Sequence, residues 1–478
     1  MNAETFRAYA HQVVDWMADY YQQIEQYPVK SQVQPGDILQ QISPEAPEEG
    51  ESMDQILKDF QAIILPGITH WQHPNYHAYF PANASFPSLL GEMLTASLGA
   101  QCMIWDTSPA AAELEEAMME WIKKVMKLPA SWAGSIQSTA SDATLNAILS
   151  AREAKTDFQI NSTGFTGEEK FRVYCSTQTH SSIEKGVKIA GIGSHNTVKV
   201  GVDDSFAMRP ELLRKAIQTD IEEGFTPLIV IAATGTTGST AMDPLEEMGE
   251  ICREFGVWFH VDAAYAGTAL LLPEFRNTQQ GLELADSFVF NPHKWMFTNF
   301  DCTAYYVKDK GTLIRTFEIL PEYLKTQHDQ SVNNYRDWGI PLGRRFRALK
   351  LWFVMRNMGI KQMQDILRKH IALTKAFTEK LEAHPDFEIL APTPLNLVCF
   401  RYKPEGMMDE GQLNGLNTKL LKSMNDSGKV YLTHTKLNGA YTLRVCIGQT
   451  YINQSHVDTL WNVLLEHSKL LISQPTQS

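Results

Sequence analysis

One lysine in this chain stands where a buried amine could do chemistry. Lys294 lies between His293 and Trp295, shortly after the apolar run 287–290. A lysine at the mouth of a buried strand is costly unless its charge is paired or neutralised. Desolvation lowers the pKa of such an amine, and the free amine can form a Schiff base with a carbonyl cofactor. Taken alone, the pattern also fits a lysine whose stem packs on Trp295 while its head reaches water.

An acid and a hydroxyl-rich loop follow two other apolar runs. Asp262 comes directly after residues 257–261, and its small neighbours, such as Ala264, would let a flat ligand approach closely. An aspartate in this position could instead cap a helix. Residues 228–233 lead into 234–240, a loop of glycines and hydroxyls that could cradle a phosphate or a ring edge. Such clusters are also ordinary loop material.

A histidine and a helix start complete the set of candidate groups. His180 follows the apolar run 172–175, although one histidine of 14 is often only a hydrogen-bonded structural residue. Residues 138–144 carry several hydroxyls and precede the helical stretch 145–154. The exposed N–H groups and the dipole of a helix start bind anions. This segment is therefore a candidate phosphate site.

The elements that must position these groups alternate between helix and strand. Helical periodicity at 211–217 and 245–252 separates short, nearly continuous apolar runs, as expected for strands covered on both faces. The expected strands are 172–175, 197–200, 228–233, 257–261, 287–290 and 303–307. This order predicts an α/β fold with a mostly parallel, doubly wound sheet. Ligands of such sheets bind beyond the carboxyl ends of the strands, where the candidate groups lie.

The combination of groups matches the needs of pyridoxal 5'-phosphate. Its phosphate needs an anion site, its ring nitrogen a carboxylate, its ring a flat partner and its aldehyde a lysine. A dinucleotide fits less well, because Gly191 and Gly193 are followed by Asn196 where the fingerprint has a third glycine. The chain has neither a P-loop motif nor a His-Glu-x-x-His zinc motif, so we expect no metal.

Composition sets the broad class. The 478 residues exceed one typical core, so at least two domains are expected. The formal net charge of -13 argues against nucleic acid and an anionic membrane as partners, and no apolar run is long enough to span a bilayer. No secretory signal is evident, and the six cysteines form no Cys-x-x-Cys pair. These features predict a soluble, cytoplasmic protein with reduced thiols.

At this point the chain resembles the group II pyridoxal-phosphate-dependent decarboxylases, and within them the aromatic-L-amino-acid decarboxylases. The resemblance covers nearly the whole chain through long, ordered motifs at 66–71, 78–81, 179–182, 260–267, 291–295, 323–325 and 340–347. It implies a homodimer with the type I aminotransferase-like fold. It also implies decarboxylation of aromatic L-amino acids to the corresponding arylalkylamines and CO2.

The resemblance and the periodicity together predict three segments. They are an N-terminal helical arm (1–83) that wraps the partner subunit, a large cofactor-binding domain (84–343) and a small C-terminal α/β domain (344–478). In the arm, helices are expected near 6–24 and 53–65, joined by an extended linker. In the small domain, strands are expected near 397–401, 429–432 and 441–447, before a final helix from about residue 454. Arg444 is expected to be an exposed strand residue.

The resemblance also implies a role for each matched residue. Lys294 corresponds to the Schiff-base lysine, Asp262 to the partner of the pyridine nitrogen and His180 to the histidine stacked on the ring. Further cofactor contacts are implied for Ala140, Ser141, Thr237, Ala264 and Asn291. The substrate pocket is implied for Trp71, Tyr79, Phe80, Ala82, Met103, His293 and Gly343. Tyr323 lies in a segment, about 308–336, that resembles a mobile active-site loop, and its implied role is protonation of the substrate Cα.

Several alternatives stay open at the level of sequence. Related aromatic aldehyde synthases deaminate the substrate oxidatively and typically replace the loop tyrosine or the stacking histidine, whereas this chain keeps Tyr323 and His180. Glutamate or histidine decarboxylases use the same cofactor geometry, and a non-enzymatic protein could retain the fold.

The preferred ring is also left open. Gly343 stands where histidine decarboxylases and plant tyrosine decarboxylases typically carry serine, and a glycine leaves room for a larger ring such as indole. Gln101 and Met103 depart from the animal enzymes, and Gln101 could face either substrate or solvent. Tryptophan, 5-hydroxytryptophan, tyrosine, DOPA and phenylalanine all remain candidates.

Overall fold

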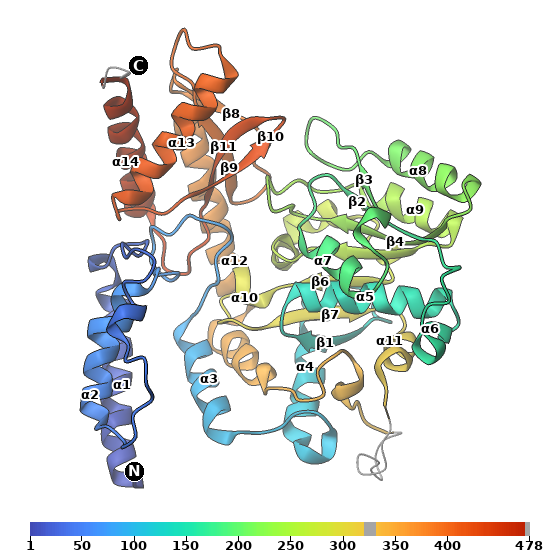
Figure 1. Ribbon diagram of the computed structural model, residues 1–478, viewed down its shortest axis with the longest axis horizontal. Coiled ribbons are helices and arrows are strands. Elements are labelled where there is room, and N and C mark those ends of the chain that lie inside the picture. The colour runs from blue at the N-terminus through green and yellow to red at the C-terminus, as the bar shows by residue number, and fades with distance from the viewer. Residues whose placement is uncertain (320–330, 474–478) are drawn as a thin grey trace. The chain divides into compact units, whose positions relative to one another are not determined.

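The computed structural model describes residues 1–319 and 331–473 (Figure 1). The chain forms two compact units. The first contains Met1–Pro81, Ala372–Leu390 and Val398–Ser478, and the second contains Ala82–Ile371 and Ala391–Leu397. The division into an arm, a large domain and a small domain stays a prediction.

The second unit is built on a seven-stranded sheet with the order β1-β7-β6-β5-β4-β2-β3. The strands are β1 (Ala133–Gln137), β2 (Phe171–Ser176), β3 (Thr197–Val200), β4 (Thr226–Ala233), β5 (Trp258–Asp262), β6 (Ser287–Phe290) and β7 (Thr303–Val307). The pairs from β3 through β6 are parallel, and β7 runs antiparallel to both β1 and β6. The predicted fold class and all six predicted strands are confirmed, whereas β1 was not predicted.

Helices cover this sheet, and Figure 1 shows α5 and α7 in front of it. The helices that begin in this unit are α3 (Phe86–Leu98), α4 (Pro109–Met126), α5 (Ala140–Lys155), α6 (Gln159–Thr163), α7 (Ser182–Ile189), α8 (Pro210–Glu222), α9 (Leu245–Phe255), α10 (Pro292–Trp295), α11 (Lys310–Phe317) and α12 (Arg347–Glu382). Ile148 of α5 packs in one core with Val173, Ile229 and Val289 of the sheet, all without exposed surface. Burial of these side chains fixes α5 against the strands.

The first unit contains a four-stranded sheet with the order β10-β11-β9-β8. Its strands are β8 (Phe387–Ile389), β9 (Leu397–Tyr402), β10 (Thr433–Leu437) and β11 (Ala440–Cys446), and its C-terminal helices are α13 (Glu410–Asp426) and α14 (Gln454–Ser473). The predicted final helix and the strands near 397–401 and 441–447 are confirmed.

Two predictions for this sheet are wrong. The strand predicted at 429–432 begins instead at Thr433, because the Asn425 side chain bonds both backbone groups of Leu432, at 2.9 and 3.0 Å. Arg444 is not exposed: only 3% of its surface is accessible. Its guanidinium donates to Thr433 Oγ1 at 3.0 Å and lies 5.4 Å from the centre of the Phe80 ring. β11 has a strand on each side in this sheet, which sequence periodicity did not reveal.

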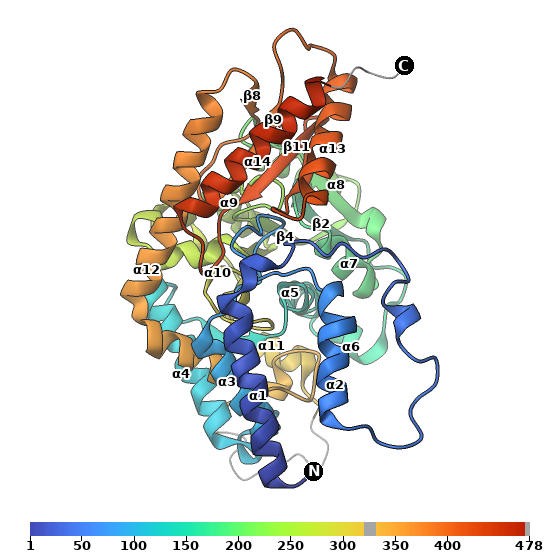
Figure 2. The same ribbon diagram turned by 90° about the vertical axis from the view of Figure 1, so that its left-hand side faces the viewer.

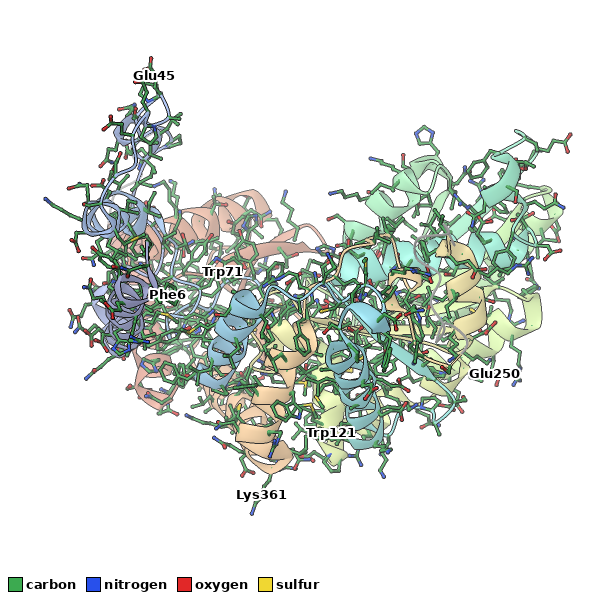
Figure 3. The ribbon with its side chains drawn as sticks, turned by 90° about the horizontal axis from the view of Figure 1, so that it is seen from below. Phe6, Glu45, Trp71, Trp121, Glu250 and Lys361 are labelled. Atoms are coloured by element: carbon green, nitrogen blue, oxygen red, sulfur yellow. The ribbon has the colours of Figure 1, made fainter. Side chains whose placement is uncertain are left out.

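The N-terminal segment consists of α1 (Ala3–Gln22) and α2 (Met53–Asp59), which lie side by side in Figures 1 and 2. Both predicted helices are confirmed, and Trp16 packs on Phe60 with ring centres 5.1 Å apart. Figure 3 shows Glu45 near the tip of the long loop between them. No residue of α1 is buried, and 62% of Phe6 is exposed. Among the described residues, no helix combines the length and apolarity needed to cross a bilayer.

Close packing of α3 gives a test of the fold. Gly91 lies so near α12 that a Cβ there would meet the Lys350 Cα at 2.7 Å. Gly91→Ala should therefore lower the free energy of unfolding by about 1–3 kcal/mol, as overpacking of a core does. Urea unfolding measures the change. The control is Gly415→Ala in α13, where a Cβ meets nothing within 4 Å and no loss is expected. Equal effects of the two variants would contradict the packing of α3 on α12.

Candidate active site

The common direction of the strands gathers the candidate groups at one edge of the large sheet. Asp262 at the end of β5 pairs with Ala233 at the end of β4. Gln137 of β1 and Phe290 of β6 both end opposite the start of β7, where they pair with Thr303 and Ala304. The segments that follow β1, β2, β4, β5 and β6 therefore leave the sheet at the same edge. All the predicted cofactor residues lie at or just after these strand ends.

Lys294 lies in the short helix α10, immediately after β6, and is half-buried. Pro292 suits the first helical position because its φ is already helical and its missing N–H needs no partner there. Asn291 fixes the start of the turn: its carbonyl accepts from the Lys294 N–H at 2.9 Å, and its own N–H donates to the Ala264 carbonyl at 3.0 Å. The Asn291 side chain accepts from the Thr303 hydroxyl at 2.8 Å. The Lys294 backbone is thus tied to two neighbouring strand ends.

Asp262 is the last residue of β5 and is half-buried. One carboxylate oxygen accepts the Ala264 N–H at 3.0 Å, which closes a turn rather than capping an α-helix. Ala264 is also half-buried. The next residue, Tyr265, stacks on Trp295 with ring centres 5.1 Å apart. The acid and the lysine are therefore held by two packed turns that touch each other.

His180 lies close enough to both groups to feel their charges. Burial lowers the pKa of its imidazole, the Asp262 charge raises it and the Lys294 charge lowers it further. The Ser182 N–H donates to His180 Nδ1 at 3.1 Å, and the Ser182 hydroxyl lies 2.8 Å from the same nitrogen. Because Nδ1 accepts a backbone hydrogen bond, the neutral ring carries its proton on Nε2. The three groups thus share one electrostatic environment.

The start of α5 offers backbone donors for an anion. Thr139 caps the helix and accepts the Asp142 N–H at 3.3 Å, while the Asp142 carboxylate accepts the Thr139 N–H at 3.2 Å and the Ser138 hydroxyl. Within the described residues, the N–H groups of Ala140 and Ser141 make no hydrogen bond. First-turn N–H groups such as these bind phosphate oxygens, helped by the helix dipole.

Thr237 is exposed in the loop that follows β4, and a residue that the sequence analysis missed holds this loop in place. The buried Asp243 carboxylate accepts the Ala233 N–H at 2.8 Å and the Met208 N–H at 2.7 Å. Burial raises the pKa of Asp243 to about 6. Gly235 has φ +86°, and a Cβ there would lie 2.5 Å from that of Ala266. An aspartate before a proline looks like ordinary turn material, so the sequence carried no distinguishing signal.

His293 is buried beside Lys294. Its Nδ1 accepts the Cys302 N–H at 3.0 Å, so the proton of the neutral ring sits on Nε2. Burial and the Lys294 charge lower the pKa of His293 to about 3. The ring is therefore neutral near pH 7, when it can donate or accept hydrogen bonds but carries no charge. The edge of Phe300 packs on it with ring centres 4.8 Å apart.

The remaining predicted substrate residues fall in both units. In the first unit, Trp71 (labelled in Figure 3) and Tyr79 are 39% and 48% exposed, and their rings stack with centres 5.9 Å apart. Phe80 of the same unit is buried. The second unit holds the others, Ala82, Met103, His293 and Gly343. Tyr323 lies outside the described residues.

Gln101 faces the backbone of Gly343. The Arg344 N–H donates to Gln101 Oε1 at 2.7 Å, and a Cβ on Gly343 would meet Gln101 Nε2 at 3.2 Å. The room expected beside the glycine is therefore occupied on this side by the Gln101 amide.

These residues suit pyridoxal phosphate. A half-buried amine, a carboxylate and an imidazole share one sheet edge, and backbone donors at a helix start lie at the same edge. The small side chain of the half-buried Ala264 would let a flat ring approach this turn closely. The fold and these residues together define a type I pyridoxal-phosphate enzyme.

Comparison with known proteins gives the family. Residues 35–403 match the pyridoxal-dependent decarboxylase conserved domain. A phenylacetaldehyde synthase of Arabidopsis thaliana is 44% identical over 99% of this chain and 97% of its own length, and tyrosine decarboxylase 4 of Petroselinum crispum is 42% identical over 99% and 95%. The crystal structure of the Oryza sativa TDC with PLP and tryptamine superimposes with a TM-score of 0.96 at 33% identity, covering 99% of each chain. The chain belongs to the pyridoxal-dependent decarboxylase family.

A buried histidine beneath the site predicts a pH dependence of stability. His260 lies in β5, with Nδ1 2.8 Å from the Ser287 hydroxyl, and burial lowers its pKa to about 3. Between this pKa and the ordinary value near 6.5, the unfolded chain binds a proton that the folded chain does not. The free energy of unfolding should therefore fall as the pH drops below about 6.5.

The variant His260→Gln removes this proton uptake. Urea unfolding between pH 7 and 4.5 should show a fall in wild-type stability that is about 2–3 kcal/mol larger than in the variant. Parallel pH dependences of the two proteins would contradict a neutral, buried His260.

Proposed function

We propose that this protein uses pyridoxal phosphate to decarboxylate aromatic L-amino acids, releasing the arylalkylamine and CO2. The observation that carries the proposal is the shared environment of Lys294, Asp262 and His180 at the strand ends of a pyridoxal-dependent decarboxylase. The substrate class rests on relatives: one is named a tyrosine decarboxylase, and a close structural neighbour was solved with tryptamine.

The residues around the cofactor would act as follows. Pyridoxal phosphate, when bound, supplies a conjugated ring that takes up the electron pair left when the carboxylate departs. The Lys294 amine would hold the cofactor and give way to the amine of the substrate. The Asp262 carboxylate would keep the ring nitrogen protonated, since an opposite charge raises the pKa of a base.

The other residues around the cofactor would bind its phosphate and position its ring. The first-turn N–H groups of Ala140 and Ser141 would bind the phosphate, with Thr237 as a further contact. His180 would cover one face of the ring, and Ala264 would leave space for the other. Asn291 would act through the Lys294 backbone, which its carbonyl already binds.

Substrate binding and proton return complete the proposal. Trp71, Tyr79, Phe80, Ala82, Met103, His293 and Gly343 would contact the side chain of the substrate. His293 would do so as a neutral ring, because its low pKa rules out a positive charge near pH 7. Tyr323, or a water that it positions, would protonate the substrate Cα.

Oxidative deamination is the rival reaction, because one relative is named a phenylacetaldehyde synthase. That reaction consumes O2 and yields an aldehyde, ammonia and hydrogen peroxide in addition to CO2. Retention of His180 and Tyr323 favours the amine as product.

An activity assay tests the proposed function. The purified protein with pyridoxal phosphate should release amine and CO2 in a 1:1 ratio from at least one of tryptophan, 5-hydroxytryptophan, tyrosine, DOPA and phenylalanine, without hydrogen peroxide. Lys294→Ala should abolish turnover, and Asp262→Ala should lower kcat at least about a hundredfold, because the charge that stabilises the electron sink is lost. Lys215→Ala, an exposed lysine of α8 in the same unit, is the control. Wild-type rates in either site variant, or peroxide as a stoichiometric product, would contradict the proposal.

We also propose that the protein is a cytoplasmic homodimer. An exposed apolar face on α3 supports the dimer: Phe86, Leu90, Met93, Leu94 and Leu98 are each 37–64% exposed. Contiguous apolar surface of this kind marks an interaction site. The exposed face of α1 in the predicted arm would pack on the partner subunit. The cysteines support the location, since all six are buried and none forms a disulfide in the part of the chain that the structure describes. The net charge of -13 gives no reason to expect nucleic acid or membrane partners.

Charges placed on α3 should break the dimer. The double variant Leu90→Asp/Leu94→Asp puts two carboxylates where an interface would desolvate them, which is strongly unfavourable. Sedimentation velocity should show a dimer for the wild type and a monomer for the variant. The control is Ile221→Asp, which alters a similarly exposed apolar residue of α8 and should leave the dimer intact. A variant that stays dimeric would place the interface elsewhere.

A further inference from the structure

The Gln101 side chain is held against the backbone that carries Gly343. The Cys102 N–H donates to the Arg344 carbonyl at 3.0 Å, and the Arg344 N–H donates to Gln101 Oε1 at 2.7 Å. The Gln101 carbonyl accepts the Thr107 hydroxyl at 2.7 Å. Backbone and side chain of Gln101 are therefore both fixed by hydrogen bonds within the second unit.

These bonds settle which way the amide points. A backbone N–H requires an acceptor, so the atom facing Arg344 is the amide oxygen and not the nitrogen. The NH2 group then lies on the Gly343 side, where a Cβ would meet Nε2 at 3.2 Å. Both residues are exposed, and within the described parts of the chain Nε2 makes no hydrogen bond. Gln101 thus presents a fixed donor beside the glycine.

We propose that Gln101 determines substrate specificity by donating a hydrogen bond to a hydroxyl on the aromatic ring. The inference rests on the proposed function, in which Gly343 contacts the side chain of the substrate. A phenolic oxygen accepts such a bond, whereas a phenyl ring has no acceptor and the indole N–H only donates. Tyrosine should therefore be preferred over phenylalanine, and 5-hydroxytryptophan over tryptophan. Each pair differs by one hydroxyl, so the preference does not depend on the size of the ring.

Desolvation of the Gln101 NH2 group explains why a substrate with a ring hydroxyl is preferred over one without it. With a bare ring, the Gln101 NH2 group would lose its water and gain no acceptor, which is the expensive case for a polar group. A site that bonds a ring hydroxyl discriminates against the analogue without it more strongly than an apolar pocket discriminates by size. Because Nε2 is the only Gln101 group involved, replacing it should remove the preference and spare the chemistry at Lys294.

Two variants separate the hydrogen-bond donor of Gln101, Nε2, from its acceptor, Oε1, which binds the Arg344 N–H. Gln101→Glu keeps an oxygen for the Arg344 N–H but replaces the NH2 group with a second acceptor. Gln101→Met removes both groups at similar length. The control is Gln218→Met, an exposed glutamine on α8. The readout is the ratio of kcat/KM for tyrosine to kcat/KM for phenylalanine, measured with the holoenzyme, with the tryptophan pair as a second ratio.

The wild-type ratio should be about tenfold, and Gln101→Met should lower it at least about fivefold, as expected for loss of one hydrogen bond to a fixed donor. Gln101→Glu should also change the ratio, because its carboxylate cannot donate to the phenolic oxygen and can only accept the phenolic O–H. The turnover number on phenylalanine should change little in either variant. A purely structural role would leave the ratio unchanged in Gln101→Glu, which keeps the Arg344 bond.

The Gly343 side of the contact gives an independent variant. Gly343→Ala places a Cβ at 3.2 Å from Nε2, so the amide must shift by a few tenths of an ångström. This variant should lower the tyrosine preference in the wild-type background and have little effect on the ratio in the Gln101→Met background. Equal effects in both backgrounds would overturn the proposal.

A wild-type ratio near one, or an unchanged ratio in Gln101→Glu, would also overturn it while the proposed function stands. A wild type that releases no amine from any aromatic amino acid would instead refute the proposed function, and the inference would fall with it.

Discussion

The common direction of β1, β2, β4, β5 and β6 is the constraint on which the site depends. Parallel strands end at one edge, so residues far apart in sequence meet there without any long-range side-chain contact to bring them together. Lys294, Asp262 and His180 come from three different strand ends, and the pKa of His180 still responds to the charges of the other two. Short turns then fix the neighbouring segments: the Asn291 N–H donates to the Ala264 carbonyl, and Asp243 anchors the loop of Thr237.

Burial sets the protonation of the histidines around this edge. The pKa values of His180, His260 and His293 are all lowered, with burial as the largest cause. Neutral imidazoles add no positive charge near Lys294, so they do not oppose the positive ring nitrogen that Asp262 would sustain. They still donate and accept hydrogen bonds, which orient them. The site therefore combines one amine and one carboxylate with neutral polar groups in a partly dry setting.

The sequence predicted the parts of this arrangement that depend on local patterns. Apolar runs identified six strands of the large sheet, and the residues just after them included Lys294, Asp262 and His180. β1 was missed because Ala133, Gly134 and Ser135 lack the β-branched character of the other strands. Contacts between segments were also beyond reach: nothing in the spacing indicates that Asn425 bonds the backbone of Leu432, that Arg444 is buried or that Gln101 lies against Gly343.

All the proposed chemistry depends on Lys294 holding the cofactor at this sheet edge. The most direct measurement is to treat the protein with pyridoxal phosphate, reduce it with borohydride, digest it and locate the modified lysine by mass spectrometry. Of the lysines in the chain, Lys294 should carry the reduced cofactor in stoichiometric amount, and none should carry it stoichiometrically in Lys294→Ala. Stoichiometric labelling of another lysine, or no labelling of the wild type, would contradict the account.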